Sequence, residues 1–96
     1  MFVVIVKAQV KPEKIDIYES TFKSLRKKVL ANEPGVTFYE LCRVPDQPCA
    51  YRVIECYRDQ ATQDEHLNKD YYKATIPIIV DCLVDGQYEM EVVEPI

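Results

Sequence analysis

The sequence lacks the features that mark nucleic-acid-binding proteins. Its 12 basic residues are outnumbered by 16 acidic ones, which gives a formal charge of −4. No broad basic face can form on such a chain. The single basic cluster, residues 26–28, lies where the last turn of a helix is expected, and there it complements the helix dipole. Nucleic acid is therefore not an expected partner.

Metal, disulfide and membrane signatures are also missing. The four cysteines form no CxxC motif, and the only histidine, His66, is not spaced from them as a zinc site requires. No apolar run approaches the roughly 20 residues that cross a bilayer, and the first residues lack the basic start of a secretory signal. We expect a cytoplasmic protein with no metal and no membrane partner, whose reduced thiols pack as small hydrophobic residues.

The pattern of apolar residues and turns predicts the first half of the chain. Residues 2–10 are rich in β-branched residues and form a strand. Residues 12–32 form an amphipathic helix, with a proline in its first turn and a Pro-Gly pair at its end. Its apolar stripe consists of Ile15, Tyr18, Phe22, Leu25 and Val29. Residues 36–44 and 50–57 form two strands, joined by a turn at residues 45–48.

The second half is predicted as two helices and a last strand. A short helix runs to about Leu67, capped by Asp59 or, in a capping box with Glu65, by Thr62. A longer helix spans residues 71–83, and Pro77 should kink or restart it near Thr75. Asp85 and Gly86 turn the chain into a strand at residues 87–93.

This order, β-α-β-β-α-β, predicts one α+β domain over residues 1–96, of the ferredoxin-like type with a four-stranded antiparallel sheet. Helices cover only one face of such a sheet. The first strand is apolar on both faces, with Val4 and Val6 on one side and Val3 and Ile5 on the other. We therefore expect a second copy of the chain to cover the bare face in a two-fold homodimer.

Chemistry-bearing residues gather around the one histidine. No GxGxxG, P-loop, GxSxG or HExxH motif is present. Glu55 and Tyr57 share one face of the third strand, and His66 follows on the next helix, so these side chains can meet over a pocket. A histidine there suits general-base work at neutral pH. Two structural readings compete with this one: His66 as a surface or dipole partner, and Glu55 as a buried hydrogen-bonded carboxylate.

Two segments resemble the antibiotic biosynthesis monooxygenase family: PGVTFYEL at residues 34–41 and AYRVIECYRDQATQDEHL at residues 50–67. The resemblance implies a homodimeric α+β barrel that oxidises a small aromatic, quinol-like or anthrone-like substrate with O2 and needs no metal or flavin. It implies His66 as the base and Glu55 as its orienter or neighbour. The substrate pocket would be walled by aromatic residues, for which the candidates are Tyr39, Tyr51, Tyr57, Tyr71 and Tyr72. We expect His66 to line a mainly apolar cavity with Tyr57 or other strand side chains.

The sequence departs from the family pattern at two points. Many relatives carry a second histidine where this chain has Tyr71, and a phenol with a pKa of about 10 is a poor base at neutral pH. Haem-degrading relatives use an Asn, Trp and His set, whereas this chain has no tryptophan and has Lys7 in the matching strand. Two other functions stay open: an isomerase of a small hydroxycarbonyl metabolite, and a non-catalytic dimeric module for ligand binding or stress.

Overall fold

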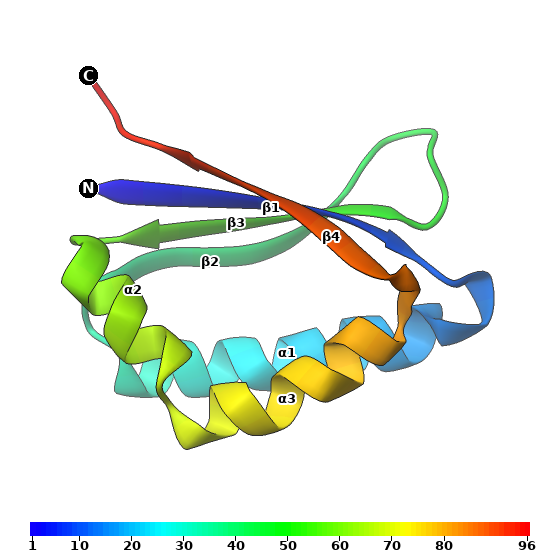
Figure 1. Cartoon of the computed structure of the whole chain (residues 1–96), viewed down its shortest axis with the longest axis horizontal. Coiled ribbons are helices and arrows are strands. Elements are labelled where there is room, and N and C mark those ends of the chain that lie inside the picture. Colours follow the sequence, from blue (N-terminus) through cyan, green and yellow to red (C-terminus); the bar gives the residue numbers. More distant parts are fainter.

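The computed structural model describes residues 1–96 as a four-stranded sheet with three helices on one face (Figure 1). The elements are β1 (Phe2–Val10), a 3-10 turn (Pro12–Lys14), α1 (Ile15–Asn32), β2 (Val36–Arg43), β3 (Ala50–Tyr57), α2 (Gln60–Leu67), α3 (Asp70–Asp81) and β4 (Leu83–Val93). The strands are all antiparallel in the order β2-β3-β1-β4. This is the predicted α+β, ferredoxin-like arrangement. No helix combines the length and the apolar content needed to span a bilayer.

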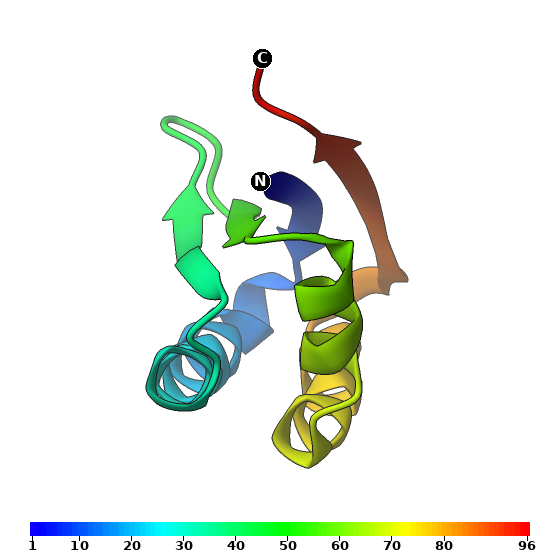
Figure 2. The same cartoon turned by 90° about the vertical axis from the view of Figure 1, so that its left-hand side faces the viewer.

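Helix α1 forms as predicted because its apolar residues recur on one stripe. Tyr18, Phe22, Leu25 and Val29 are all buried against the sheet. Figure 2 shows α1 under the β2 side of the sheet and α3 under the β4 side. The two helices therefore cover the sheet side by side.

The last strand begins four residues earlier than predicted. Leu83 already pairs with Val10 of β1, and the register shifts between Ala8 and Val10. Asp85 and Gly86 both adopt left-handed backbone angles, with φ of 55° and 63°. Two such residues in succession produce a bulge that keeps the strand direction, whereas the sequence predicts a turn there. The helix consequently ends at Asp81 and does not reach residue 83.

Helix α3 runs from Asp70 to Asp81 without a break, so the predicted restart near Thr75 is wrong. Pro77 removes one backbone hydrogen bond. Packing offsets this loss, because Tyr72 and Ile79 lie against the core clusters under the sheet. The Thr75 hydroxyl donates to the carbonyl of Tyr71 at 2.6 Å within the same helix.

The cysteines are all free thiols. Only Cys82 is buried as a small hydrophobic residue, whereas Cys42 is exposed on β2. The prediction that the cysteines pack in the core is therefore correct for Cys82 and wrong for Cys42, because Cys42 lies on the sheet face that no helix covers.

Candidate active site

A cavity of about 210 Å³ lies between the sheet and the helices. Every strand and every helix contributes to its wall, and 15 of its 17 lining residues are hydrophobic. The two polar ones are Glu55 of β3 and Gln63 of α2. The wall formed by β4 includes Tyr88 and Met90, which are 56% and 58% exposed, so the cavity adjoins solvent at this edge of the sheet.

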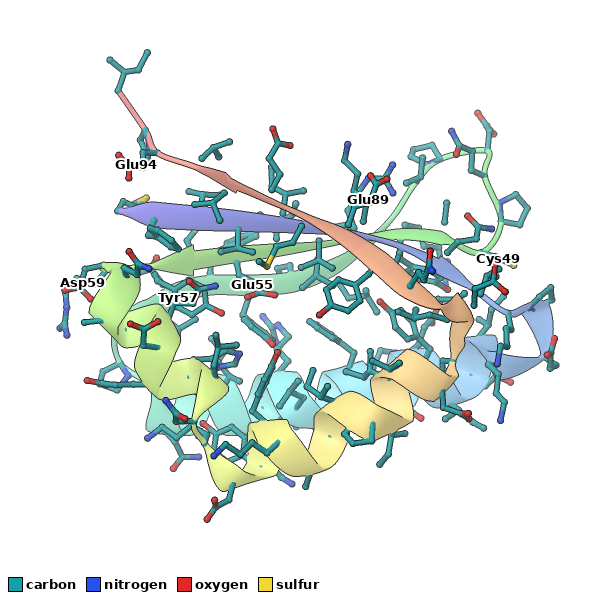
Figure 3. All side chains as sticks on the ribbon, in the orientation of Figure 1. Cys49, Glu55, Tyr57, Asp59, Glu89 and Glu94 are labelled. Atoms are coloured by element: carbon teal, nitrogen blue, oxygen red, sulfur yellow. The ribbon has the colours of Figure 1, made fainter.

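Glu55 is the only ionisable carboxyl group in the cavity wall. It projects from β3 toward the helices, on the same side as Tyr57, whose hydroxyl donates a hydrogen bond to Glu55 Oε1 (Figure 3). Burial raises the pKa of Glu55 from 4.5 to about 7, and this effect outweighs the opposing hydrogen bond from Tyr57. The carboxyl group is thus close to half-ionised at neutral pH, as a general base requires.

His66 lies behind the cavity wall, and the prediction that it lines the cavity is wrong. Its side chain has no exposed surface. Two tyrosines that do line the cavity, Tyr39 and Tyr72, pack against its ring at centroid distances of 5.3 and 4.7 Å. These larger rings occupy the space through which the imidazole would otherwise reach a ligand. Tyr57 is also fully buried and lies outside the cavity wall.

Both ring nitrogens of His66 have partners. Nδ1 lies 2.9 Å from Oε1 of Glu33, and Nε2 lies 3.4 Å from the Tyr39 hydroxyl. Burial lowers the pKa of His66 below 6.5, and the nearby Glu33 carboxylate opposes this only in part. His66 is therefore a neutral imidazole at pH 7.

The close approach of α2 to the end of α1 explains how Glu33 and His66 meet. Asp59 caps α2 by accepting a hydrogen bond from the Thr62 backbone N–H at 2.8 Å, so Asp59 and not Thr62 is the N-cap. Thr62 packs directly on Gly35, where an added β carbon would lie 2.6 Å from Thr62 Cγ2. His66 follows Thr62 by one helical turn on the same face and so lies beside Glu33.

Sequence reasoning missed Glu33. A signal was available, since a carboxylate at the C-terminal end of a helix is disfavoured by the helix dipole and implies a compensating partner. Here the partners are His66 and the hydroxyl of Tyr71, which also donates to Glu33. No group of three or more metal-ligating side chains is present in the structure.

The five predicted tyrosines occupy three different environments. Tyr39 and Tyr72 line the cavity, whereas Tyr57 and Tyr71 bond to Glu55 and Glu33 behind it. Tyr51 lies apart from the others in a second core cluster, and its hydroxyl donates to Glu19 of α1 at 2.5 Å. It shares a strand face with Glu55, but the two residues are four steps apart along the strand, which is roughly 13 Å.

Comparison with known proteins agrees with this fold. The model of the antibiotic biosynthesis monooxygenase family matches residues 1–77. A structure from Caulobacter crescentus CB15 that bears this family's name is 29% identical, with a TM-score of 0.93 over 99% of this chain and 89% of that one. A conserved protein from Methanosarcina mazei Go1 is also 29% identical, with a TM-score of 0.90 over 96% of this chain and 89% of that one. No curated protein matches the chain. The chain belongs to the antibiotic biosynthesis monooxygenase family.

Proposed function

We propose that this protein is a cofactor-independent monooxygenase that oxidises a small aromatic, quinol-like or anthrone-like substrate with O2 in the cavity between sheet and helices. The observation that carries the proposal is the apolar cavity with a single carboxyl group whose pKa is about 7. Membership of a monooxygenase family supports the class of reaction. An apolar cavity of about 150 Å³ holds benzene, so the 210 Å³ found here suits a substituted ring or two fused rings. The third ring of an anthrone-like substrate would extend to the β4 edge, where the cavity adjoins solvent.

The chemistry requires little from the protein beyond a base and a dry site. Glu55 takes a proton from the bound hydroxyl or activated C–H group, and the resulting electron-rich anion reduces O2 directly. One oxygen atom enters the product and the other leaves as water, with all four electrons supplied by the substrate. The hydrophobic lining keeps bulk water away from the anion and the reduced oxygen on every side except the β4 edge.

His66 keeps an indirect part in this proposal. It touches Tyr39 and Tyr72 of the cavity wall, so its substitution acts on a ligand through these two rings. Tyr51 is left out of the proposed substrate site because its hydroxyl is bound to Glu19 in the other core cluster.

We also propose a two-fold homodimer through the sheet face that no helix covers. This face carries apolar side chains from all four strands: Val3, Ile5, Phe38, Ile54, Cys56 and Val93. It carries both charge signs as well, since Lys7 pairs with Arg52 on one side and with Glu89 on the other. Figure 3 shows Glu89 pointing away from the helices. A two-fold axis can place the basic pair of one copy opposite the acidic edge of the other.

Light scattering tests the dimer. We expect a mass of twice the 11.2 kDa chain at micromolar concentration, and a shift to the single-chain mass in Phe38→Glu. Thr37→Glu places the same charge one residue away on β2 and serves as the control. A monomeric wild-type protein would contradict the dimer.

Oxygen uptake tests the reaction. Metal-free protein is assayed against a panel of reduced naphthoquinols and anthrones, with Glu55→Gln and Tyr51→Phe alongside the wild type. We expect uptake above autoxidation in the wild type and Tyr51→Phe, and its loss in Glu55→Gln. If no substrate gives uptake, the monooxygenase proposal fails. Proton exchange in a bound hydroxycarbonyl compound would then indicate an isomerase, and binding without exchange a non-catalytic module.

A further inference from the structure

We propose that Glu33, His66 and Tyr39 form a directional hydrogen-bond chain that holds the Tyr39 oxygen as a hydrogen-bond acceptor for ligands in the cavity. Glu33 is the positioning residue of this chain. The inference rests on the proposed function because it concerns the same cavity. It adds a requirement for the substrate, which must carry a hydroxyl group that donates to Tyr39.

Glu33, at the buried end of the hydrogen-bond chain, sets the direction in which its hydrogens are donated. Glu33 is 6% exposed, accepts a hydrogen bond from the hydroxyl of Tyr71 and lies 2.9 Å from the Nδ1 atom of His66. A carboxylate has no hydrogen to give, so both partners must be donors. The ring proton of His66 therefore lies on Nδ1, and the lone pair of Nε2 faces the Tyr39 hydroxyl.

The second hydrogen bond, between the Tyr39 hydroxyl and Nε2 of His66, fixes where the phenol hydrogen of Tyr39 points. A phenol has one hydrogen, and the unprotonated Nε2 of His66 can only accept it. The Tyr39 ring cannot turn away, because it stacks on Phe22 with an interplanar angle of 4° and packs edge-on against His66. Burial also raises the pKa of Tyr39, so it remains a neutral phenol. Its oxygen lone pairs are what remains for a ligand.

Of the three residues in the hydrogen-bond chain, only Tyr39 lines the cavity. A bound phenol or quinol can donate its hydroxyl to Tyr39, whereas the matching methyl ether cannot. Glu55 also accepts when it is ionised, whereas the other lining groups, namely Tyr18, Tyr72 and Gln63, carry hydrogens of their own. The contribution of the chain is therefore the part of the ligand preference that disappears when Glu33 is changed.

Measuring the tautomer of His66 tests the hydrogen-bond chain without any ligand. Since His66 is the only histidine, protein labelled with 15N-histidine gives one pair of ring nitrogen signals, which distinguish the two neutral tautomers and the cation. We expect the Nδ1–H tautomer at pH 7 in the wild type and in the control Tyr51→Phe. In Glu33→Gln the side-chain amide can donate to Nδ1, so we expect a substantial Nε2–H population. A wild-type protein with Nε2–H or a cationic ring would overturn the inference.

Ligand selectivity tests the consequence. The probes are 2-naphthol and 2-methoxynaphthalene, titrated into the wild type, Glu33→Gln, Tyr39→Phe and Tyr51→Phe. We expect the wild type to favour the naphthol, and Glu33→Gln and Tyr39→Phe each to reduce that preference by about three- to tenfold, as for one ordinary hydrogen bond. Tyr51→Phe removes a phenol that lies outside both the cavity wall and the hydrogen-bond chain, so it should keep the preference.

The two failures are distinguishable. An unchanged preference in Glu33→Gln, with binding intact, would overturn this inference and leave the proposed oxygenase untouched. Binding of neither probe to the wild type would overturn the ligand selectivity together with the cavity as an aromatic site, while the tautomer would still decide the direction of the chain.

Discussion

The Nδ1 atom of His66 lies 2.9 Å from Oε1 of Glu33, and both side chains are buried although 33 residues separate them in the sequence. This contact joins the end of α1 to the last turn of α2. It fixes the position of the helix that carries Gln63 and Leu67 into the cavity wall. The buried pair therefore has two consequences, one for the charge state of His66 and one for the shape of the site.

His66 should remain neutral at pH values where an ordinary histidine is protonated. Burial lowers its folded-state pKa below 6.5, so the native protein binds fewer protons than the unfolded chain as the pH falls through this range. Stability present above pH 6.5 is then lost on acidification. The ring C–H signals of the single histidine, followed by NMR from pH 8 to 6, should shift little. A midpoint at or above 6.5 would contradict the assignment of a neutral ring.

Glu55 should give the opposite pH dependence. Its folded-state pKa of about 7 exceeds the ordinary 4.5, so the native protein keeps a proton that the unfolded chain has lost. The stabilisation is complete below about pH 4.5 and disappears as the pH rises to about 7, a loss of about 2–4 kcal/mol. Urea unfolding of wild type and Glu55→Gln across this range measures it as a difference. Parallel curves for the two proteins would show that Glu55 has an ordinary pKa.

If Glu55 is the base, activity follows its ionised form. The rate at limiting substrate should then rise with pH through a midpoint near 7, where the carboxyl group loses its proton. Tyr57→Phe removes the hydrogen bond that lowers this pKa, so its midpoint should move upward. Oxygen uptake as a function of pH measures both. A midpoint that Tyr57→Phe leaves in place would assign the titration to another group.

Gly35→Ala should destabilise the protein for a steric reason. The added methyl group would lie 2.6 Å from Cγ2 of Thr62, and Thr62 cannot easily move because its hydroxyl is held by Asp59 at 2.7 Å. We expect a loss of about 1–3 kcal/mol in the free energy of unfolding. Thr62→Ser removes the clashing methyl and keeps the hydroxyl, so the double variant should recover part of this loss. Additive effects in the two variants would rule out the contact as the cause.

Tyr51→Phe should affect stability and leave ligand binding alone. The change removes a hydrogen bond to a carboxylate on α1, worth about 1–2 kcal/mol. The residue lies in the cluster around Val10 and Leu83 and does not line the cavity. Thermal unfolding and titration with 2-naphthol measure the two effects. A large fall in naphthol affinity would return Tyr51 to the substrate site.

Local patterns were sufficient for the architecture. The stripe from Tyr18 to Val29 repeats at helical spacing, and the alternating residues of β3 repeat at strand spacing, so each element follows from residues close together in the chain. The order of elements then leaves few topologies, and the ferredoxin-like one was correct. The family resemblance was also correct, and it too depends on short continuous segments, residues 34–41 and 50–67.

Backbone conformation and depth of burial depended on contacts between distant residues. The bulge at Asp85 and Gly86 arises because β4 must pair with β1 on both sides of it, which residues 83–93 alone do not specify. Residues 60–67 carry no apolar stripe, so the sequence did not decide whether His66 faces the core or solvent. Only the packing of α2 on the α1–β2 turn placed Glu33 at one ring nitrogen and put Tyr39 and Tyr72 between the imidazole and the cavity. Local spacing assigns a residue to a buried face, whereas its neighbours, and hence its chemistry, are set by the elements that pack against that face.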